Sequence, residues 1–394
     1  MARVPGKFGK CVLKKQLGKG ATALVFLAEH EGLGIQVAVK VLRKQLSKTR
    51  PEYAQRFLRE ARTAARLEHP NIVRVIDCGV QSGYHYMVMD YVDGKDCMEM
   101  LRKQPEGLPW RTVVEVARQA ADGLSYAVEN GIIHRDVKPS NLMIDSNGRV
   151  RVTDLGLAKL TVEGVAALTQ ELHTVGTPNY MSPEQIRKPS DIDVRADIYS
   201  LGATSYHLVT ARPPFVGDNP MEVVSKHLTE PLTPPYKVKR GLPAGLSKVI
   251  CKMMAKNPDR RYQDYEQLML DLDNLLIDKD VSAQDFEETY HTTEEDEKLV
   301  EMFERLASGE RVEIEDADET TDTVRPEQIP ETDGSPGVAP FEETDFTSYE
   351  SDSPEGDSTV LARRGQPGMN VWLLVVLVGL AAAALVGIAL ALAL

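Results

Sequence analysis

The spacing of apolar positions divides the chain into a strand-rich first part, a helical second part and a polar third part. Early in the chain, short runs rich in Val, Ile and Tyr are separated by glycines, which predicts β-strands. The strands are expected at residues 10–17, 24–29, 36–42, 72–78 and 84–91. One helix interrupts them, because apolar residues recur at helical spacing across residues 52–67, with Glu60 in the same pattern.

Helical spacing takes over from Trp110 onward. The clearest patterns lie at residues 113–130, 194–210, 246–254 and 265–276. The order predicts an α+β fold with a small β-rich lobe at about residues 8–92 and a larger helical lobe at about residues 93–277. We expect these two lobes to form one globular domain, residues 8–277.

Residues 278–369 lose this periodicity and fill with Asp, Glu, Thr, Ser and Pro. Residues 278–360 contain 28 acidic and 5 basic side chains. Such a composition cannot bury enough apolar surface to offset the conformational entropy of an ordered chain, so we expect a disordered acidic juxtamembrane linker. A short amphipathic helix at residues 295–306 is the alternative within it, because its apolar residues fall at helical spacing.

Residues 370–394 carry no charge and are long enough, at about 1.5 Å per residue, to cross a hydrocarbon layer of roughly 30 Å. We expect a single-pass, tail-anchored transmembrane helix in contact with lipid. Arg363 and Arg364 precede it, and basic residues favour the cytoplasmic side, so the globular domain is expected in the cytoplasm. Small residues four apart, such as Gly379 and Ala383, would let two such helices pair in a homodimer, although an Ala-rich segment also produces this spacing by chance.

Charge and cysteine content exclude several classes of protein. Residues 1–277 carry 39 basic and 31 acidic side chains without a concentrated basic face, so we expect no nucleic-acid binding. The four cysteines are scattered and form no CxxC pair, which argues against a disulfide framework or a zinc site. The N-terminus has no apolar run long enough for a signal peptide.

Two short motifs in the strand-rich part are suited to bind phosphate. Gly18 and Gly20 lie between two predicted strands, where the absence of a Cβ lets the backbone approach phosphate oxygens closely. Lys40 ends an apolar strand and needs an anionic partner, either a phosphate or a carboxylate such as Glu60. While each motif stands alone, a plain glycine turn and a lysine that points to water are the alternatives.

A third motif is more specific. The segment His134-Arg135-Asp136-Val137-Lys138-Pro139-Ser140-Asn141 is followed, after a second apolar strand, by Thr153-Asp154-Leu155-Gly156. Asp136 can accept or orient a hydroxyl proton, and Asn141 and Asp154 supply the oxygen ligands that Mg²⁺ prefers when it bridges ATP phosphates. One acid alone could be an ordinary loop carboxylate, but an ordered set of this length is very improbable by chance.

From about Phe8 to Leu276 the chain resembles the protein kinase family. The resemblance implies the bilobal kinase fold, with ATP as phosphate donor and Mg²⁺, or alternatively Mn²⁺, as cofactor. It implies that Asp136 is the catalytic base and that Lys40 pairs with both the ATP phosphates and Glu60. Lys138 resembles the serine/threonine subgroup, in which it contacts the transferred phosphate, so the expected substrates are Ser and Thr hydroxyls of proteins, including those of the kinase itself.

The same resemblance assigns the remaining site residues. Those expected to contact the nucleotide are Leu17, Gly18, Gly20, Val25, Ala38, Lys40, Glu60, Met89, Asp90, Val92 and Met143. Met89 resembles the gatekeeper, and the stretch from Asp90 to Val92 resembles the hinge that binds adenine through its backbone. Asn141 and Asp154 are expected to hold the metal. Glu184, Asp197 and Arg261 match architectural positions, with Arg261 as the partner of Glu184.

Residues 176–184, GTPNYMSPE, resemble the end of an activation segment. In this family the arginine at the position of Arg135 commonly docks a phosphorylated activation segment, so Thr169 and then Thr174 are the expected regulatory acceptors. Ordinary exposed threonines are the alternative. This segment, combined with a linker and one membrane helix, resembles the eukaryotic-like serine/threonine kinases of bacteria.

Three positions depart from the family pattern: Ala23, Leu155 and Ser182. None of them removes a phosphate or metal ligand, so activity is expected. The alternative from another class is a membrane-anchored pseudokinase scaffold, but such proteins typically lack the residues that stand here as Lys40 and Asp136. A small-molecule kinase on the same fold is disfavoured by the complete GTPNYMSPE segment, which shapes a peptide-binding surface.

Overall fold

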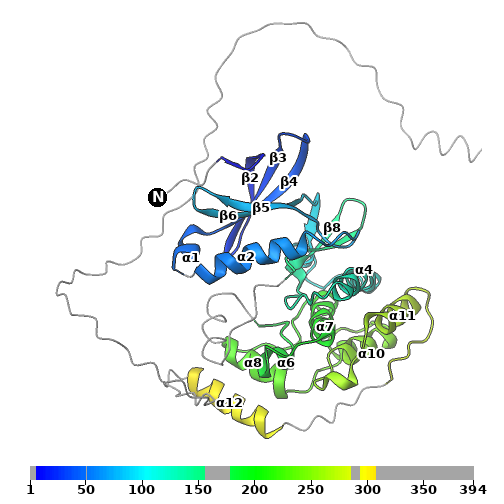
Figure 1. The fold of residues 1–394 in the computed structure, drawn as a ribbon. Coiled ribbons are helices and arrows are strands. Elements are labelled where there is room, and N and C mark those ends of the chain that lie inside the picture. The colour runs from blue at the N-terminus through cyan, green and yellow to red at the C-terminus, as the bar shows by residue number, and fades with distance from the viewer. Residues whose placement is uncertain (1–5, 50, 156–177, 285–292, 308–394) are drawn as a thin grey trace, which may run out of the picture. The chain divides into compact units, whose positions relative to one another are not determined.

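The computed structural model describes residues 6–49, 51–155, 178–284 and 293–307. All of them belong to one unit of the chain, Met1–Thr321. Figure 1 shows a strand-rich lobe with helix α2 beside its sheet, above a larger lobe of helices. The bilobal α+β architecture predicted from the apolar pattern is therefore confirmed for these residues.

The first lobe is built on a six-stranded antiparallel sheet with the order β1-β2-β3-β4-β6-β5. Its strands are β1 (Lys7–Phe8), β2 (Cys11–Lys19), β3 (Ala23–His30), β4 (Ile35–Leu42), β5 (Val75–Gln81) and β6 (Tyr84–Asp90). Helices α1 (Lys44–Thr49) and α2 (Pro51–Ala64) connect β4 to β5. Four of the five predicted strands lie within two residues of these bounds.

The fifth predicted strand, residues 72–78, begins later than the apolar run suggested, at Val75. Ile72 instead forms an isolated parallel bridge with Val152, and the N–H of Val73 donates to the Val152 carbonyl at 2.9 Å. These apolar residues are buried because they join the two lobes, not because they extend the sheet.

Strand β4 lies between two apolar cores, and its alternation decides to which side Lys40 points. Its side chains alternate in direction, as in any strand. Val37, Val39 and Val41 belong to the core on one face of the sheet, and Ala38 and Leu42 belong to the core that contains α2. Lys40 has the parity of Ala38 and Leu42, so it points to the side of the sheet that faces α2 and the second lobe.

The second lobe surrounds a central helix, α7 (Val194–Thr210), in which 14 of 17 residues are buried. Around it lie α3 (Cys97–Arg102), α4 (Trp110–Glu129), α6 (Pro183–Arg187), α8 (Pro220–Thr229), α9 (Pro235–Val238), α10 (Ala244–Met253) and α11 (Tyr265–Leu276). Gly202 lets α7 approach α10 closely, because a Cβ at this position would lie only 2.7 Å from the Cβ of Met253. Any polar side chain on α7, such as Asp197, must find its partners inside the lobe.

A small second sheet positions the loops between the lobes. It has the order β7-β8-β9, with β7 (Gly94–Asp96), β8 (Leu142–Asp145) and β9 (Val150–Val152). A short 3-10 turn, Pro139–Asn141, leads directly into β8, and Asp154 follows β9 by two residues. The two motifs singled out in the sequence therefore stand at neighbouring ends of one hairpin.

The prediction of a disordered linker from Asp278 onward is wrong for the part of it that the structure describes. Val281 and Ala283 pack against the core of the helical lobe, and the buried Asp271 accepts hydrogen bonds from the backbone N–H and the hydroxyl of Ser282. The alternative helix is formed as α12 (Glu294–Ala307), and it packs against α8. Composition alone does not reveal these contacts. A few apolar side chains per turn are enough to stabilise a helix when a folded lobe supplies the surface on which they pack.

Among the described helices, none combines the length and the apolar character needed to cross a bilayer. The predicted transmembrane segment, residues 370–394, and most of the predicted linker lie outside the described residues.

Candidate active site

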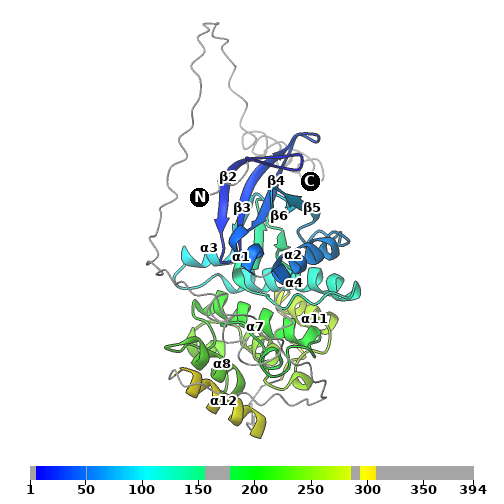
Figure 2. The ribbon, with the colours of Figure 1, turned by 60° about the vertical axis from the view of Figure 1, so that its left-hand side comes forward.

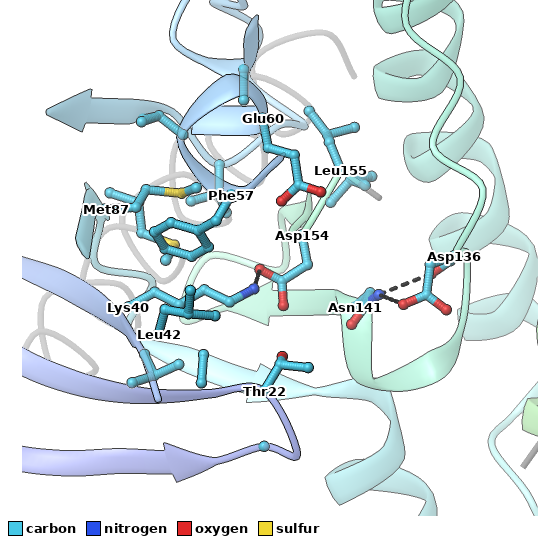
Figure 3. A pocket seen from close by; sticks show the side chains of 18 of the residues that line it. Thr22, Lys40, Leu42, Phe57, Glu60, Met87, Asp136, Asn141, Asp154 and Leu155 are labelled. Atoms are coloured by element: carbon cyan, nitrogen blue, oxygen red, sulfur yellow. Dashed lines mark hydrogen bonds and ion pairs between the residues drawn. The ribbon is translucent and has the colours of Figure 1, made fainter. Parts of the chain in front are cut away.

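Nine of the predicted site residues line a cavity of about 360 Å³ between the two lobes. Figure 3 shows the side chains that line it, with Lys40 from the sheet on one side and Asp136 and Asn141 from the helical lobe on the other. The predicted residues that line it are Gly20, Val25, Lys40, Glu60, Met89, Asp136, Lys138, Asn141 and Asp154. Side chains that the sequence did not single out complete the wall, among them Phe57 and Met87.

Lys40 forms an ion pair with Asp154, across the boundary between the lobes. Its Nζ lies 2.8 Å from Asp154 Oδ1. Asp154 adopts a φ of 53°, in the left-handed region that non-glycine residues rarely occupy, and this conformation follows directly after β9. The resemblance to kinases had assigned Glu60 to Lys40 as its carboxylate partner. In this structure that pairing is wrong, because Asp154 takes the ammonium group.

The burial of the Glu60 carboxyl group is only partly compensated. Its Oε1 has no hydrogen-bond partner among the described residues. Burial raises the pKa of Glu60 to about 8, and the attraction of Lys40 only partly opposes this because the charge of Asp154 adds repulsion. One ammonium group faces two carboxyl groups here, and the one that does not pair with it is held in its neutral form at pH 7.

The Lys40–Asp154 pair stays charged although the Lys40 side chain is mostly buried. Burial opposes the charge of Lys40, but the nearby carboxylate of Asp154 outweighs it, so the pKa of Lys40 is raised. Burial likewise opposes the charge of Asp154, yet the ammonium of Lys40 lowers the pKa of Asp154 below its usual value. The cavity thus holds a positive and a negative charge in direct contact, one from each lobe.

Asp136 is held by the two polar residues that follow it in its loop. Lys138 Nζ donates to Asp136 Oδ2 at 2.8 Å. The side-chain amide of Asn141 donates to the backbone carbonyl of Asp136 at 2.8 Å and to its Oδ2 at 3.1 Å. These contacts fix the direction of the carboxylate and leave the amide oxygen of Asn141 as the side-chain atom able to bind a cation.

His134 connects this loop to the residue that precedes Asp154. Its Nδ1 accepts the N–H of Asp136 at 3.2 Å, so its Nε2 carries the proton and donates to the carbonyl of Thr153 at 2.9 Å. The ring is completely buried. His134 was part of the quoted motif but had no assigned role, and its position inside that motif was the only sequence signal for it.

Asp197 on α7 binds the backbone of the loop that carries His134 and Asp136. Its carboxylate accepts the backbone N–H groups of His134 and Arg135, each at 2.7 Å. These bonds stabilise the left-handed backbone of Arg135, whose φ is 64°. Burial raises the pKa of Asp197, opposed by His134 and by the two backbone N–H groups. Its predicted architectural role fits this geometry.

Helix α6 carries a second set of supports. Glu184 and Arg261 form the predicted pair through two bonds, 2.6 and 2.9 Å, and Arg261 is fully buried. The side chain of Gln185 donates to the carbonyl of Arg135 at 2.8 Å. Gln185 was missed in the sequence, because its role depends on a backbone atom 50 residues away.

The donor set fits a hard divalent cation beside a nucleotide. Asn141 and Asp154 line the cavity with oxygen atoms, and Lys40 places a positive charge there for phosphate. Mg²⁺ typically takes one or two side-chain oxygens from the protein and the rest from phosphate and water. The two predicted metal ligands therefore stand where such an ion could bind both of them and a phosphate.

The residues expected around adenine lie on the sheet and the connection between the lobes. Ala38 and Met89 are register partners on β4 and β6, and both are buried. Asp90 ends β6 and Val92 follows it in the connection to β7. The others are placed on neighbouring elements: Leu17 and Gly18 on β2, Val25 on β3 opposite Lys40, and Met143 on β8.

The two predicted regulatory threonines, Thr169 and Thr174, lie outside the described residues. Arg135, their expected docking partner, is described, and its backbone is fixed by Asp197 and Gln185 as above.

Comparison with known proteins identifies the same region. Residues 11–271 match the protein kinase domain family. The serine/threonine-protein kinase PknB of Mycobacterium tuberculosis is 42% identical over 260 residues, which cover 65% of this chain and 41% of that protein. A probable serine/threonine-protein kinase of Streptomyces coelicolor is 39% identical over 279 residues, which cover 70% of this chain and 41% of that protein.

Among solved structures, the kinase domain of Mycobacterium tuberculosis PknI is similar, with 30% identity and a TM-score of 0.56. That similarity covers 70% of this chain and 100% of the PknI domain. The match to PknB and to the Streptomyces protein thus spans about two fifths of their length and is confined to one domain.

Proposed function

Because this chain belongs to the protein kinase family, as a eukaryotic-like bacterial serine/threonine kinase, we propose that it transfers the γ-phosphate of ATP to Ser and Thr hydroxyls of proteins. The observation that carries the proposal is the assembly of Lys40, Asp136 and Asp154 around one cavity. The three residues come from three separate segments, and only the fold brings them together.

The substrate hydroxyl would be oriented by Asp136. Its carboxylate is held by Asn141 and Lys138, so one oriented oxygen can accept the hydroxyl proton as the bond to phosphorus forms. Lys138 lies next to the same carboxylate and stabilises the negative charge on the transferred group. Both side chains are fixed before substrate arrives, which lowers the cost of reaching the reactive geometry.

Phosphate and metal would be held beside Asp136, between the two lobes. Lys40 supplies a positive charge for the phosphates, and Asn141 and Asp154 supply oxygens for Mg²⁺, with Mn²⁺ as an alternative ion. A bound divalent ion neutralises charge on the phosphate oxygens.

A scaffold that binds nucleotide without transfer is the second reading, and the geometry disfavours it. Asp136 is bonded to Lys138 and to the cation ligand Asn141, and the other cation ligand, Asp154, pairs with Lys40. A scaffold would need none of these contacts.

Regulation and location extend the proposal beyond the kinase domain. We propose that Thr169 or Thr174 is phosphorylated and that the phosphate docks on Arg135. The side chain of Asp197 supports this proposal, because it accepts the backbone N–H of Arg135 and holds that residue in place. The uncharged run at residues 370–394, preceded by Arg363 and Arg364, supports a membrane anchor with the kinase domain in the cytoplasm. Its small residues at four-residue spacing support pairing of two anchors in a homodimer.

The test is phosphate transfer by the full chain in detergent or vesicles, with radiolabelled ATP, Mg²⁺ or Mn²⁺, and a set of unfolded protein substrates. Acid hydrolysis then identifies the labelled amino acid. Label on phosphoserine or phosphothreonine that disappears in Lys40→Met supports the proposal. Nucleotide binding without transfer to any substrate would support the scaffold instead.

A further inference from the structure

The peptide bond between Arg135 and Asp136 is held at both of its polar groups. The N–H of Asp136 donates to Nδ1 of His134 at 3.2 Å, and the carbonyl of Arg135 accepts the side-chain amide of Gln185 at 2.8 Å. Because a peptide unit is planar, the two contacts together fix the direction in which the backbone enters Asp136. Gln185 therefore acts on the backbone directly before the carboxylate that orients the substrate hydroxyl.

The other end of the Gln185 amide is bound to the start of α6. Its Oε1 accepts the N–H of Ser182 at 3.0 Å, and the backbone N–H of Gln185 donates to Ser182 Oγ at 3.4 Å, which makes a capping box. The side chain is buried. Since one amide is bound both to α6 and to the loop of Asp136, a shift of α6 would move or break its contact with the loop.

Helix α6 depends on its neighbours for its position. It has five residues, and an isolated helix of this length is not stable in water. Glu184 is bound to the buried Arg261. The two residues that follow Gln185 contact α12 instead, Ile186 through apolar packing and Arg187 through an ion pair. The C-terminal half of α6 is thus held by a helix that comes more than a hundred residues later in the chain.

The contact with α12 is both apolar and charged. In both ribbon views α12 lies alongside α8, at the end of the lobe remote from the sheet (Figures 1 and 2). Phe303 is completely buried in a cluster with Ile186 and with three residues of α8, Met221, Val224 and Leu228. Asp296 is also fully buried, and its Oδ1 accepts Arg187 Nε at 2.6 Å. A buried carboxylate is costly without a partner, so this pair favours one position of α6 against α12.

We propose that Gln185 is a positioning residue for phosphate transfer and that α12 acts through it, by holding α6 where Gln185 binds the carbonyl of Arg135. Gln185 does not line the cavity between the lobes, so its effect on transfer passes through the backbone of Asp136. Helix α12 is then part of the catalytic unit, although it lies beyond residues 11–271 that match the kinase family. The proposal rests on the proposed kinase function.

The first test removes the donated hydrogen bond in the full chain. Gln185→Met has nearly the shape of the wild type but no amide, so the single-turnover rate of phosphate transfer should fall roughly tenfold, the order of one hydrogen bond. Nucleotide affinity should stay unchanged. Gln267→Met is the matched control, because Gln267 has the same place in α11 and binds its N-cap, Asp264. It should change neither quantity. A wild-type transfer rate in Gln185→Met would overturn the proposal.

The second test asks whether α12 acts through Gln185. Phe303→Ala and Asp296→Asn each weaken the contact with α6 in a different way, and each should lower the transfer rate of the wild type. In the Gln185→Met background they should cause little further loss, because both changes act on the same bond. The exposed Glu301→Ala on α12 is the control and should have no effect in either background. Losses that multiply independently would overturn the role of α12.

A third readout needs no catalysis. Backbone hydrogen exchange of residues 132–142, followed by mass spectrometry on the full chain, should be faster in Gln185→Met and in Phe303→Ala than in wild type and the two controls. The reason is that the loop loses a contact that fixes its backbone. If the wild type transferred no phosphate, the kinase function would fail while exchange still tested the positioning. Unchanged exchange in both variants would overturn the positioning itself.

Discussion

Lys40 Nζ lies 2.8 Å from Asp154 Oδ1, which ties the sheet of the first lobe to the end of β9 in the second. Glu60, a half-buried carboxyl group near the same ammonium, does not pair with it, and its pKa is raised to about 8. Lys40, Asp154 and Glu60 are therefore coupled, since a change in one of them alters the charge of the other two.

Glu60 should make the stability of the protein depend on pH. Its pKa is about 8 in the folded chain against 4.5 for an ordinary glutamate, so the folded state binds more protons between these values and its stability falls as pH rises through 8. Glu60→Gln, which stays neutral, should remove this slope and stabilise the protein at pH 9 by on the order of 2 kcal/mol relative to wild type. Urea unfolding at pH 6, 7.5 and 9 measures it.

The matched control for that experiment is Glu68→Gln, at a strongly exposed position. It should leave the pH slope of the wild type unchanged. If Glu60→Gln and wild type lose stability in parallel between pH 6 and 9, the carboxyl group is not held neutral in the fold.

Asp154 should control the reactivity of Lys40. Without the Asp154 carboxylate, burial is the largest remaining influence and lowers the pKa of Lys40, so more of the amine is uncharged at pH 8. Asp154→Asn should therefore increase the rate at which Lys40 reacts with an acylating reagent by roughly tenfold for each unit of pKa lost. Peptide mass spectrometry reads the rate at Lys40, with the exposed Lys48 as internal reference. An unchanged ratio of the two rates would contradict the charge coupling.

Asp197 should be needed for the geometry of the loop more than for nucleotide binding. Asp197→Ala leaves the buried N–H groups of His134 and Arg135 without their acceptor, at about 1–3 kcal/mol each. We expect a lower Tm, a fall in kcat and an unchanged nucleotide affinity. Asp191→Asn, at an exposed position before α7, is the control and should change none of the three. A normal kcat in Asp197→Ala would show that the loop is held by other contacts.

Exchanging the two charged residues Glu184 and Arg261 should not preserve the stability of the protein. Arg261→Ala leaves Glu184 without its partner and should destabilise the protein by about 3–5 kcal/mol. The double change Glu184→Arg/Arg261→Glu should fail to restore stability, because Arg261 also donates to the carbonyls of Ala255 and Lys256, which a carboxylate cannot do.

An exposed pair provides the comparison for that experiment. Arg111 binds Asp278 at 2.8 Å on the surface, and Arg111→Ala should cost less than about 1 kcal/mol. Chemical unfolding of the wild type and the three variants measures all these differences. Recovery of wild-type stability by the reversed pair would mean that the attraction between the two charges is the whole of the interaction.

Much of the fold followed from the sequence, because β-strand alternation and helical spacing are local properties. β4 and α7 were placed within a residue or two of their bounds, and the loop from His134 to Asn141 identified the active site. The onset of β5 was misplaced because Ile72 is apolar for a different reason, its contact with Val152. The periodicity of apolar residues predicts that a residue is buried, but it does not identify the residues against which it packs.

The errors in the site have the same origin. Two carboxylates, Glu60 and Asp154, compete for Lys40, and only their positions in space decide which one pairs with it. Gln185 acts on a backbone atom far away in the chain, for which no side-chain motif exists. The seating of α12 was hidden by its acidic composition, because the surface that makes its folding favourable belongs to α6 and α8.

Asp136→Asn tests the central claim most directly. The measurement is a single-turnover rate of phosphate transfer to a Ser- or Thr-containing protein, together with nucleotide affinity, beside wild type and the exposed control Asp218→Asn. If Asp136 orients and accepts the hydroxyl proton, the rate should fall by roughly 10²- to 10⁴-fold while nucleotide affinity stays within about threefold. A rate near that of wild type would contradict the assignment of Asp136 as the group on which transfer depends.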